Sequence, residues 1–194
     1  MSPDRARTIL DFWFLLADHP QHGMSRAEWF RKNDAFDEEI RQHFGADIDA
    51  ALSSRFEDGS DEEMLARILL LDQFTRNTFR NTPGAFAGDA QALDIAKLLV
   101  SSGRDKNLTP FQRWFAYLPF EHSESLLDQE RAVALYEGLR REMQNETFDG
   151  AYDYALKHRA IIVRFGRFPH RNEILSREST AEEIEFLTQP GSSF

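Results

Sequence analysis

The amino-acid sequence predicts an all-α fold of eight or nine antiparallel helices packed as helical hairpins, with no sheet. Helix start and stop signals recur along the whole chain, whereas the alternation of apolar and polar side chains that marks a strand is almost absent. The segments between the expected helices are short and polar, as at 19–23 and 104–108. Short connections of this kind favour antiparallel neighbours.

The start and stop signals define the elements in order. Ser2 followed by Pro3 predicts a first helix through about Ala17, because proline is favoured at the first helical position. A Ser or Thr followed three residues later by Glu or Gln is the capping-box pattern of a helix start. This pattern occurs at Ser25 and Glu28, Ser60 and Glu63, Thr109 and Gln112, and Thr180 and Glu183. Glycines that follow periodic apolar runs predict the stops, at Gly45, Gly59, Gly103 and Gly166.

The composition indicates a single helical domain over residues 1–194. Hydrophobic residues make up 41% of the chain, enough for one sizeable core, and no Pro-, Gly- or Ser-rich linker divides it. The chain has no cysteine, which excludes disulfides, thiol catalysis and thiolate metal ligands. A net charge of -10 argues against nucleic acid as a partner, since phosphate contacts dominate that affinity. No apolar run approaches the ~20 residues of a membrane-spanning helix, so we expect a soluble cytoplasmic protein with no membrane partner.

Three polar segments stand out in this acidic chain. The stretch from Tyr154 to Asn172 carries five lysine and arginine side chains and no acidic one, although the net charge of the chain is -10. The other two segments are LLLDQFTRNTFR (Leu69 to Arg80) and PFEHSE (Pro119 to Glu124). Scattered solubilising charge should follow the sign of the whole chain, so cations set among aromatic residues indicate a built site. We expect the three segments to meet in the fold around a hollow that solvent can reach.

The first segment lies on a helix expected from about Asp61 to Asn81. Its apolar stripe continues into Asp72, and Asp72, Arg76 and Arg80 follow at four-residue intervals on one face. A buried carboxylate must be paired, which predicts a clamp between Asp72 and Arg76. Arg80, one turn further out, is the better candidate for contact with a ligand.

The second segment follows a helix that Pro119 is expected to end at Leu118. Ser123 is a candidate cap for the next helix, so the acidic and histidine side chains around it crowd a helix start. They are candidates for capping alone, for acid–base chemistry, or for metal ligation with help from elsewhere. The spacing matches no established metal motif such as HExxH. The residues concerned are Glu121, His122 and Glu124.

The third segment combines a histidine on an apolar helix face with a basic turn. His158 lies on that face, where a histidine is more often a satisfied core residue than a ligand. The basic residues after it can bind a carboxylate or phosphate through the fork of the guanidinium group, or they can pair with the acids of the other two segments. They are Arg164, Arg167, His170 and Arg171.

These motifs resemble a known bacterial family. LLLDQFTRNTFR, LPFEHSE and RFGRFPHRN, together with the early DFWF and the closing PGSSF, look like the family catalogued as domain of unknown function 924. The resemblance covers nearly the whole chain and implies a tetratricopeptide-like helical fold. It implies no established activity, substrate or cofactor. Thr75 stands where proline is expected in the family pattern, which bears on local helix geometry.

Three hypotheses for function follow. The one that the sequence favours is a binding protein for an anionic small molecule or an acidic peptide. Its groove would be lined by Arg80, Arg164, Arg167, His170 and Arg171. A hydrolase is the alternative, with or without a metal. Its general base would be Glu121 or Glu124, and its acid or metal ligand His122, His158 or His170. In the third hypothesis the polar segments form an internal network that fixes helix register, and function lies in contacts with a partner.

Overall fold

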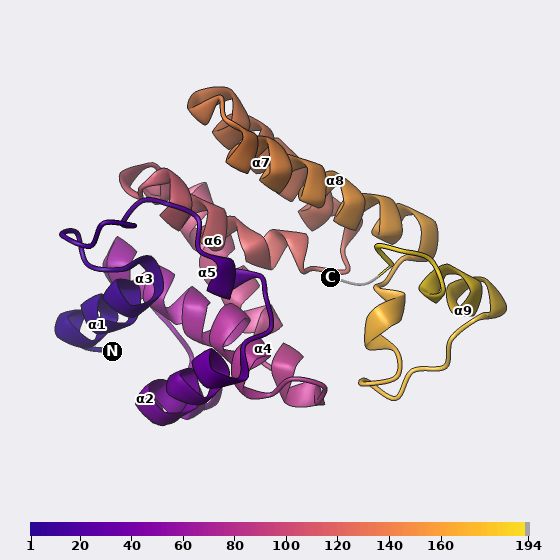
Figure 1. Cartoon of the computed structure of the whole chain (residues 1–194), viewed down its shortest axis with the longest axis horizontal. Helices are drawn as coiled ribbons and strands as arrows, with labels where there is room; N and C mark the ends of the chain where they lie inside the picture. The colour runs from indigo at the N-terminus through magenta and orange to yellow at the C-terminus, as the bar shows by residue number, and fades with distance from the viewer. Residues whose placement is uncertain (193–194) are drawn as a thin grey trace.

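The computed structural model describes residues 1–192 and is all-helical, with no strand in that range (Figure 1). The α-helical segments are α1 (Pro3–Phe14), α2 (Asp34–Ser53), α3 (Asp61–Ile68), α4 (Thr75–Thr78), α5 (Asp89–Ser101), α6 (Pro110–Glu121), α7 (Leu126–Met143), α8 (Glu146–Phe165) and α9 (Ala181–Leu187). A π-helical segment, Leu69–Phe74, joins α3 to α4 without a break, so these segments make eight separate helices. Short 3₁₀ turns lie at Ala27–Trp29, Pro83–Phe86, Arg104–Asn107 and Pro169–Arg171. The predicted fold class is confirmed.

The helices fall into two regions joined by α6. Helix α3 packs against α1, α5 and α6, while α7 packs against α6 and α8. Figure 1 shows α7 and α8 as a long antiparallel hairpin, with the C-terminal segment and α9 beyond the far end of α8. No helix within residues 1–192 is long and apolar enough to cross a membrane. The cytoplasmic location stays a prediction of the sequence.

The core is built mainly from aromatic rings. Trp13 of α1 lies 5.9 Å from Phe36 of α2, 5.3 Å from Phe74 of the π-helical segment and 5.4 Å from Phe115 of α6, between ring centroids. Aromatic side chains bury large areas and add favourable edge and offset contacts. These rings therefore hold together four elements that are far apart in the sequence. A smaller apolar cluster lies where α8 ends and the residues after it begin, and it includes Phe168.

Most of the capping signals form the helix starts that they predict. The boxes at Ser60, Thr109 and Thr180 are complete, with the side-chain and backbone hydrogen bonds both present. The Ser25 box is wrong, because that region holds only a three-residue 3₁₀ turn, Ala27–Trp29. The helix stop at Gly45 is also wrong, since α2 continues to Ser53. The buried face of α2 runs on past the glycine, and packing of that face outweighs the local signal.

The prediction that a helix ends at Leu118 is wrong. Helix α6 continues through Pro119 to Glu121, and the backbone N–H of His122 donates to the Leu118 carbonyl at 2.8 Å. Pro119, Phe120 and Glu121 are all buried, so packing offsets the hydrogen bond that proline removes. The next helix starts at Leu126 and Ser123 does not cap it.

The helix predicted from Asp61 to Asn81 changes its winding in the middle and ends early. All six side chains of the π-helical segment Leu69–Phe74 are buried, including that of Asp72. A surface helix buries only one stripe of side chains, whereas this segment is buried all round. The backbone of Gly88 packs directly against this segment. A Cβ atom added to Gly88 would lie 2.2 Å from the Leu71 carbonyl oxygen.

Candidate functional site

The three polar segments meet in the structure, as the sequence predicts, whereas the solvent-reachable hollow expected around them stays a prediction. Asp72 of the first segment contacts His122 of the second at 2.7 Å between Oδ1 and Nδ1. Glu124 of the second accepts the backbone N–H of Phe168 of the third at 2.8 Å. Eight side chains at this junction are called the polar cluster below. They are Asp72, Arg76, Asp89, Glu121, His122, His158, His170 and Arg171.

Asp72 is the anchor of the polar cluster. Its side chain is fully buried, and Gln73 donates to its Oδ2 at 2.7 Å. The Nη1 of Arg76 lies 3.2 Å from its Oδ1 and also donates to its carbonyl, at 2.5 Å, which confirms the predicted clamp. Burial opposes ionisation, but the charge of Arg76 and the hydrogen bonds from His122 and Gln73 outweigh it and hold the pKa of Asp72 well below its ordinary value. Asp72 is therefore a buried carboxylate anion.

His122 has one ring nitrogen fixed by a hydrogen bond, and its side chain is slightly exposed. Burial, and then the positive charge of Arg76, lower the pKa of His122 below its ordinary value, so the ring is neutral at pH 7. An ionised Asp72 can only accept a hydrogen bond, which places the proton of the neutral ring on Nδ1. Nε2 then carries a lone pair. The side chain is 14% exposed, in contrast to the fully buried Asp72.

His158 forms a second carboxylate–imidazole pair beside the first. Its Nδ1 lies 2.9 Å from Oε1 of Glu121 and 2.9 Å from the Tyr154 carbonyl. Its ring centroid is 6.2 Å from that of His122. Gln129 donates to the carbonyl of Glu121 at 2.6 Å, which holds this end of α6 in place. Two imidazoles are thus each oriented through Nδ1 by a carboxylate.

Two arginines of the polar cluster share one carboxylate. Asp89, at the start of α5, accepts from Arg76 at 2.9 and 3.1 Å and from Arg171 at 3.3 Å. The guanidinium of Arg171 lies between the rings of Phe86 and Phe168, at 4.8 and 4.6 Å. Burial, and next the charge of Arg76, lower the pKa of Arg171 to about 10. The two guanidinium groups face the carboxylates of Asp72 and Asp89, so the charges here are balanced.

His170 completes a group of three histidines. Burial, and then the charge of Arg171 and the other two histidines, lower the pKa of His170 to about 3, so its ring is neutral. It lies against Phe168, with 5.6 Å between ring centroids. No three Asp, Glu or His side chains in the part of the chain that the structure describes are arranged to hold a metal ion.

Glu124 lies at the margin of the polar cluster and fastens the third segment. Besides the Phe168 N–H, it accepts from Arg177 at 2.7 and 3.0 Å. Burial is outweighed by Arg177 and the Phe168 N–H, which lower the pKa of Glu124. This carboxylate is committed to holding the turn at 168–171 in place, which leaves His122 as the better candidate base.

Three predicted arginines lie outside the polar cluster. Arg80 binds Asp37 of α2, because α4 ends at Thr78 and the ladder from Asp72 stops after Arg76. Arg164 and Arg167 point instead to α9. The Nε atom of Arg164 is 2.9 Å from Glu182, and that of Arg167 is 2.6 Å from Glu183. Of the predicted groove residues, the structure therefore brings only His170 and Arg171 into the polar cluster.

Sequence reasoning missed Asp89 and Arg177. In the sequence, Asp89 resembles any acidic residue in the first turn of a helix. Its role depends on its contact with Arg171, 82 residues further on. Arg177 lies outside the three polar segments. No local signal marks either residue, because both act through contacts between distant parts of the chain.

Comparison with known proteins agrees with the fold and leaves the chemistry open. A solved structure of ATU0120, a protein of unknown function from Agrobacterium tumefaciens, is 35% identical, with a TM-score of 0.75. The match covers 95% of this chain and 97% of that one. No curated protein matches the chain. The sequence profile of the bacterial proteins of unknown function DUF924 matches residues 9–191. The chain belongs to this DUF924 family.

Proposed function

We propose that the protein is an acid–base enzyme, a hydrolase, with His122 as its general base. One observation carries the proposal. A neutral, partly exposed imidazole is held at 2.7 Å by a fully buried, ionised carboxylate, Asp72. This arrangement fixes the tautomer that leaves Nε2 able to take a proton, as the aspartate does for the histidine of a catalytic triad.

The neighbouring pair supports proton transfer in both directions. His158 is oriented by Glu121 in the same way, and its ring centroid is 6.2 Å from that of His122. A substrate atom lying between two such imidazoles can lose a proton to one and gain a proton from the other. Water activated by His122 would attack the substrate, and His158 would protonate the leaving group. His158 takes the acid role because His122 is already assigned as the base and Glu121 holds the His158 ring through Nδ1.

The anion-binding hypothesis has a second, narrower form. Arg76 and Arg171 share Asp89, which is 22% exposed, so a ligand carboxylate or phosphate can replace Asp89 between the two guanidinium groups. Because the charges are balanced without a ligand, Asp89→Asn should create an excess of positive charge. We expect phosphate and citrate to raise the melting temperature of this variant more than that of the wild type.

Hydrolysis of chromogenic esters, phosphoesters and peptide anilides tests the main proposal. His122→Gln and Asp72→Asn should each abolish turnover of the accepted class, whereas His43→Gln, at an exposed histidine, should leave it unchanged. The rate should rise with pH through an apparent pKa below the ordinary histidine value, since the neutral ring of His122 is the active form.

The controls separate loss of chemistry from loss of fold. Each variant is first shown by its melting curve to be folded at the assay temperature. Turnover retained in folded His122→Gln would overturn the role of His122. Absence of turnover in the wild type on all three substrate classes would remove the support for a hydrolase and leave the binding hypothesis.

A further inference from the structure

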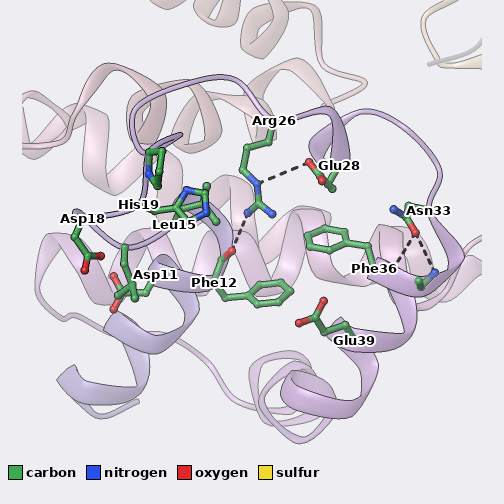
Figure 2. Close-up of a pocket in the computed structure, with 13 residues that line it drawn as sticks. Asp11, Phe12, Leu15, Asp18, His19, Arg26, Glu28, Asn33, Phe36 and Glu39 are labelled. Atoms are coloured by element: carbon green, nitrogen blue, oxygen red, sulfur yellow. Dashed lines mark hydrogen bonds and ion pairs between the residues drawn. The ribbon is translucent and has the colours of Figure 1, made fainter.

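A pocket with no part in the polar cluster opens between the end of α1, the loop that follows it and the start of α2 (Figure 2). Its volume is about 670 Å³, within the usual range for a small-molecule site. The rings of Phe12 and Phe36 stack in its wall, with centroids 5.3 Å apart and planes 6° apart. Leu15 and Leu16 add apolar surface. The pocket therefore offers a ligand an aromatic face and an aliphatic edge.

The charges around this pocket are unequal. The carboxylates of Asp11, Asp18, Glu28 and Glu39 line it, against the single guanidinium of Arg26. Figure 2 shows Asp11 and Asp18 on one side of the Phe12 ring and Glu39 on its other side, below the Phe36 ring.

Arg26 is committed to its neighbours. It donates to the Phe12 and Trp13 carbonyls at 2.9 and 2.7 Å, which caps the end of α1, and it lies 3.9 Å from Glu28. Within residues 1–192, Asp11, Asp18 and Glu39 form no ion pair. Asp11 and Asp18 are thus left without a counter-ion beside an aromatic wall, and Glu39 interacts with Arg26 only through its charge, without an ion pair.

We propose that this pocket binds a small organic cation, an ammonium or guanidinium group carried on an apolar body. Aromatic faces attract cations, and Arg26 already lies 5.6 Å from the centroid of the Phe36 ring. The uncompensated carboxylates attract the positive group and disfavour anions. The apolar body would lie on Phe12 and the two leucines. The site is independent of the hydrolase proposal, because the two share no residue.

Calorimetric titration with three matched probes tests the proposal. They are 2-phenylethylammonium, neutral 2-phenylethanol and phenylacetate, which share the ring and differ in charge. We expect the ammonium to bind and the other two to bind more weakly or not at all. Tryptophan fluorescence gives a second readout, because Trp13 lies 5.9 Å from Phe36. Binding should weaken as salt is added, since the carboxylates are partly exposed.

A charge-matched pair of variants locates the site. Asp11→Asn combined with Glu39→Gln should raise the Kd of the ammonium by about fivefold or more, which is the expected size of losing exposed charge pairs. Asp49→Asn is the control, because it removes an exposed carboxylate from the same helix as Glu39 but outside the pocket. Each single variant is measured as well, in case the double variant is poorly folded.

Several results would overturn the proposal. Equal binding of the ammonium and the alcohol would show that charge plays no part. Undiminished binding to the folded Asp11 and Glu39 variants would place the ligand elsewhere. Failure of the ammonium to bind at millimolar concentration, with binding of a lysine-rich peptide, would identify the surface as a peptide-docking site. Failure of all probes would exclude the pocket as a site for this class.

Discussion

Replacement of Asp72 by asparagine removes one negative charge from the polar cluster and keeps the shape of the side chain. The hydrogen bonds can be retained. The remaining oxygen can accept from His122 and Arg76, which now lie 2.7 and 3.2 Å from Oδ1. Gln73 can rotate its amide and accept from the new NH₂ group. The charge is therefore the main loss.

The size of the loss in stability depends on which other groups compensate the positive charge of Arg76. Removing one partner of a buried ion pair costs about 3–5 kcal/mol, because it leaves the other charge without compensation. Arg76 keeps its two contacts with Asp89, at 2.9 and 3.1 Å. We therefore expect Asp72→Asn to lower the free energy of unfolding by about 3 kcal/mol, at the lower end of that range.

Urea denaturation at pH 7, followed by tryptophan fluorescence, measures this loss. Asp94→Asn is the matched control, since Asp94 is exposed on α5 and should change stability by less than about 0.5 kcal/mol. The pH dependence gives a second test. Because the pKa of Asp72 is lowered in the folded protein, its ionisation stabilises the fold above the ordinary aspartate pKa, and this contribution is lost as the pH falls.

The difference between wild type and Asp72→Asn should therefore shrink below about pH 4, the ordinary aspartate range. A variant as stable as wild type at pH 7 would show that the carboxylate does not hold the polar cluster together. A loss of stability that stays constant down to acid pH would show that packing, and not charge, is responsible.

Gly88, Gly138 and the ion pair between Arg167 and Glu183 give further tests. Gly88→Ala should cost about 3 kcal/mol in denaturation experiments, because the new Cβ would lie 2.2 Å from the Leu71 carbonyl oxygen. Gly138→Ala, where nothing lies within 4 Å, should instead stabilise α7 by about 1 kcal/mol, and a loss there would contradict the packing described. The hydrogen bond from Arg167 contributes most to lowering the pKa of Glu183, to about 2. The stability that this ion pair contributes is present above the ordinary glutamate pKa and is lost as the pH falls through about 2. Arg167→Gln should therefore reduce the melting temperature at pH 6 and have little effect near pH 2.

The fold could be predicted from the sequence where the signals are local. A capping box closes its hydrogen bonds within four residues, so the pattern at Ser60, Thr109 and Thr180 is sufficient to place a helix start. A prediction from a local signal is wrong where packing outweighs that signal. Helix α2 passes through Gly45, and α6 passes through Pro119, because the buried residues that follow favour continuation of the helix.

The candidate site could be predicted only in part. The sequence marks Asp72 because this residue interrupts an apolar stripe, and its pairing with Arg76 follows from four-residue spacing. Its contact with His122, 50 residues away, could be proposed only as a meeting of polar segments. The roles of Asp89 and the π turn have no sequence signature, because the first depends on Arg171 and the second on how the buried helix is packed on all sides.

Stability alone does not account for a carboxylate at position 72. Buried ion pairs are often replaced by apolar side chains of similar size at little cost or with a gain. A leucine there would continue the buried stripe of Leu65, Ile68 and Leu69, and would avoid the desolvation of a charge. A leucine cannot accept a hydrogen bond from the Nδ1–H group of His122. The hydrogen bond to Asp72 orients that imidazole, whose side chain is 14% exposed, and a leucine at this position would not supply it.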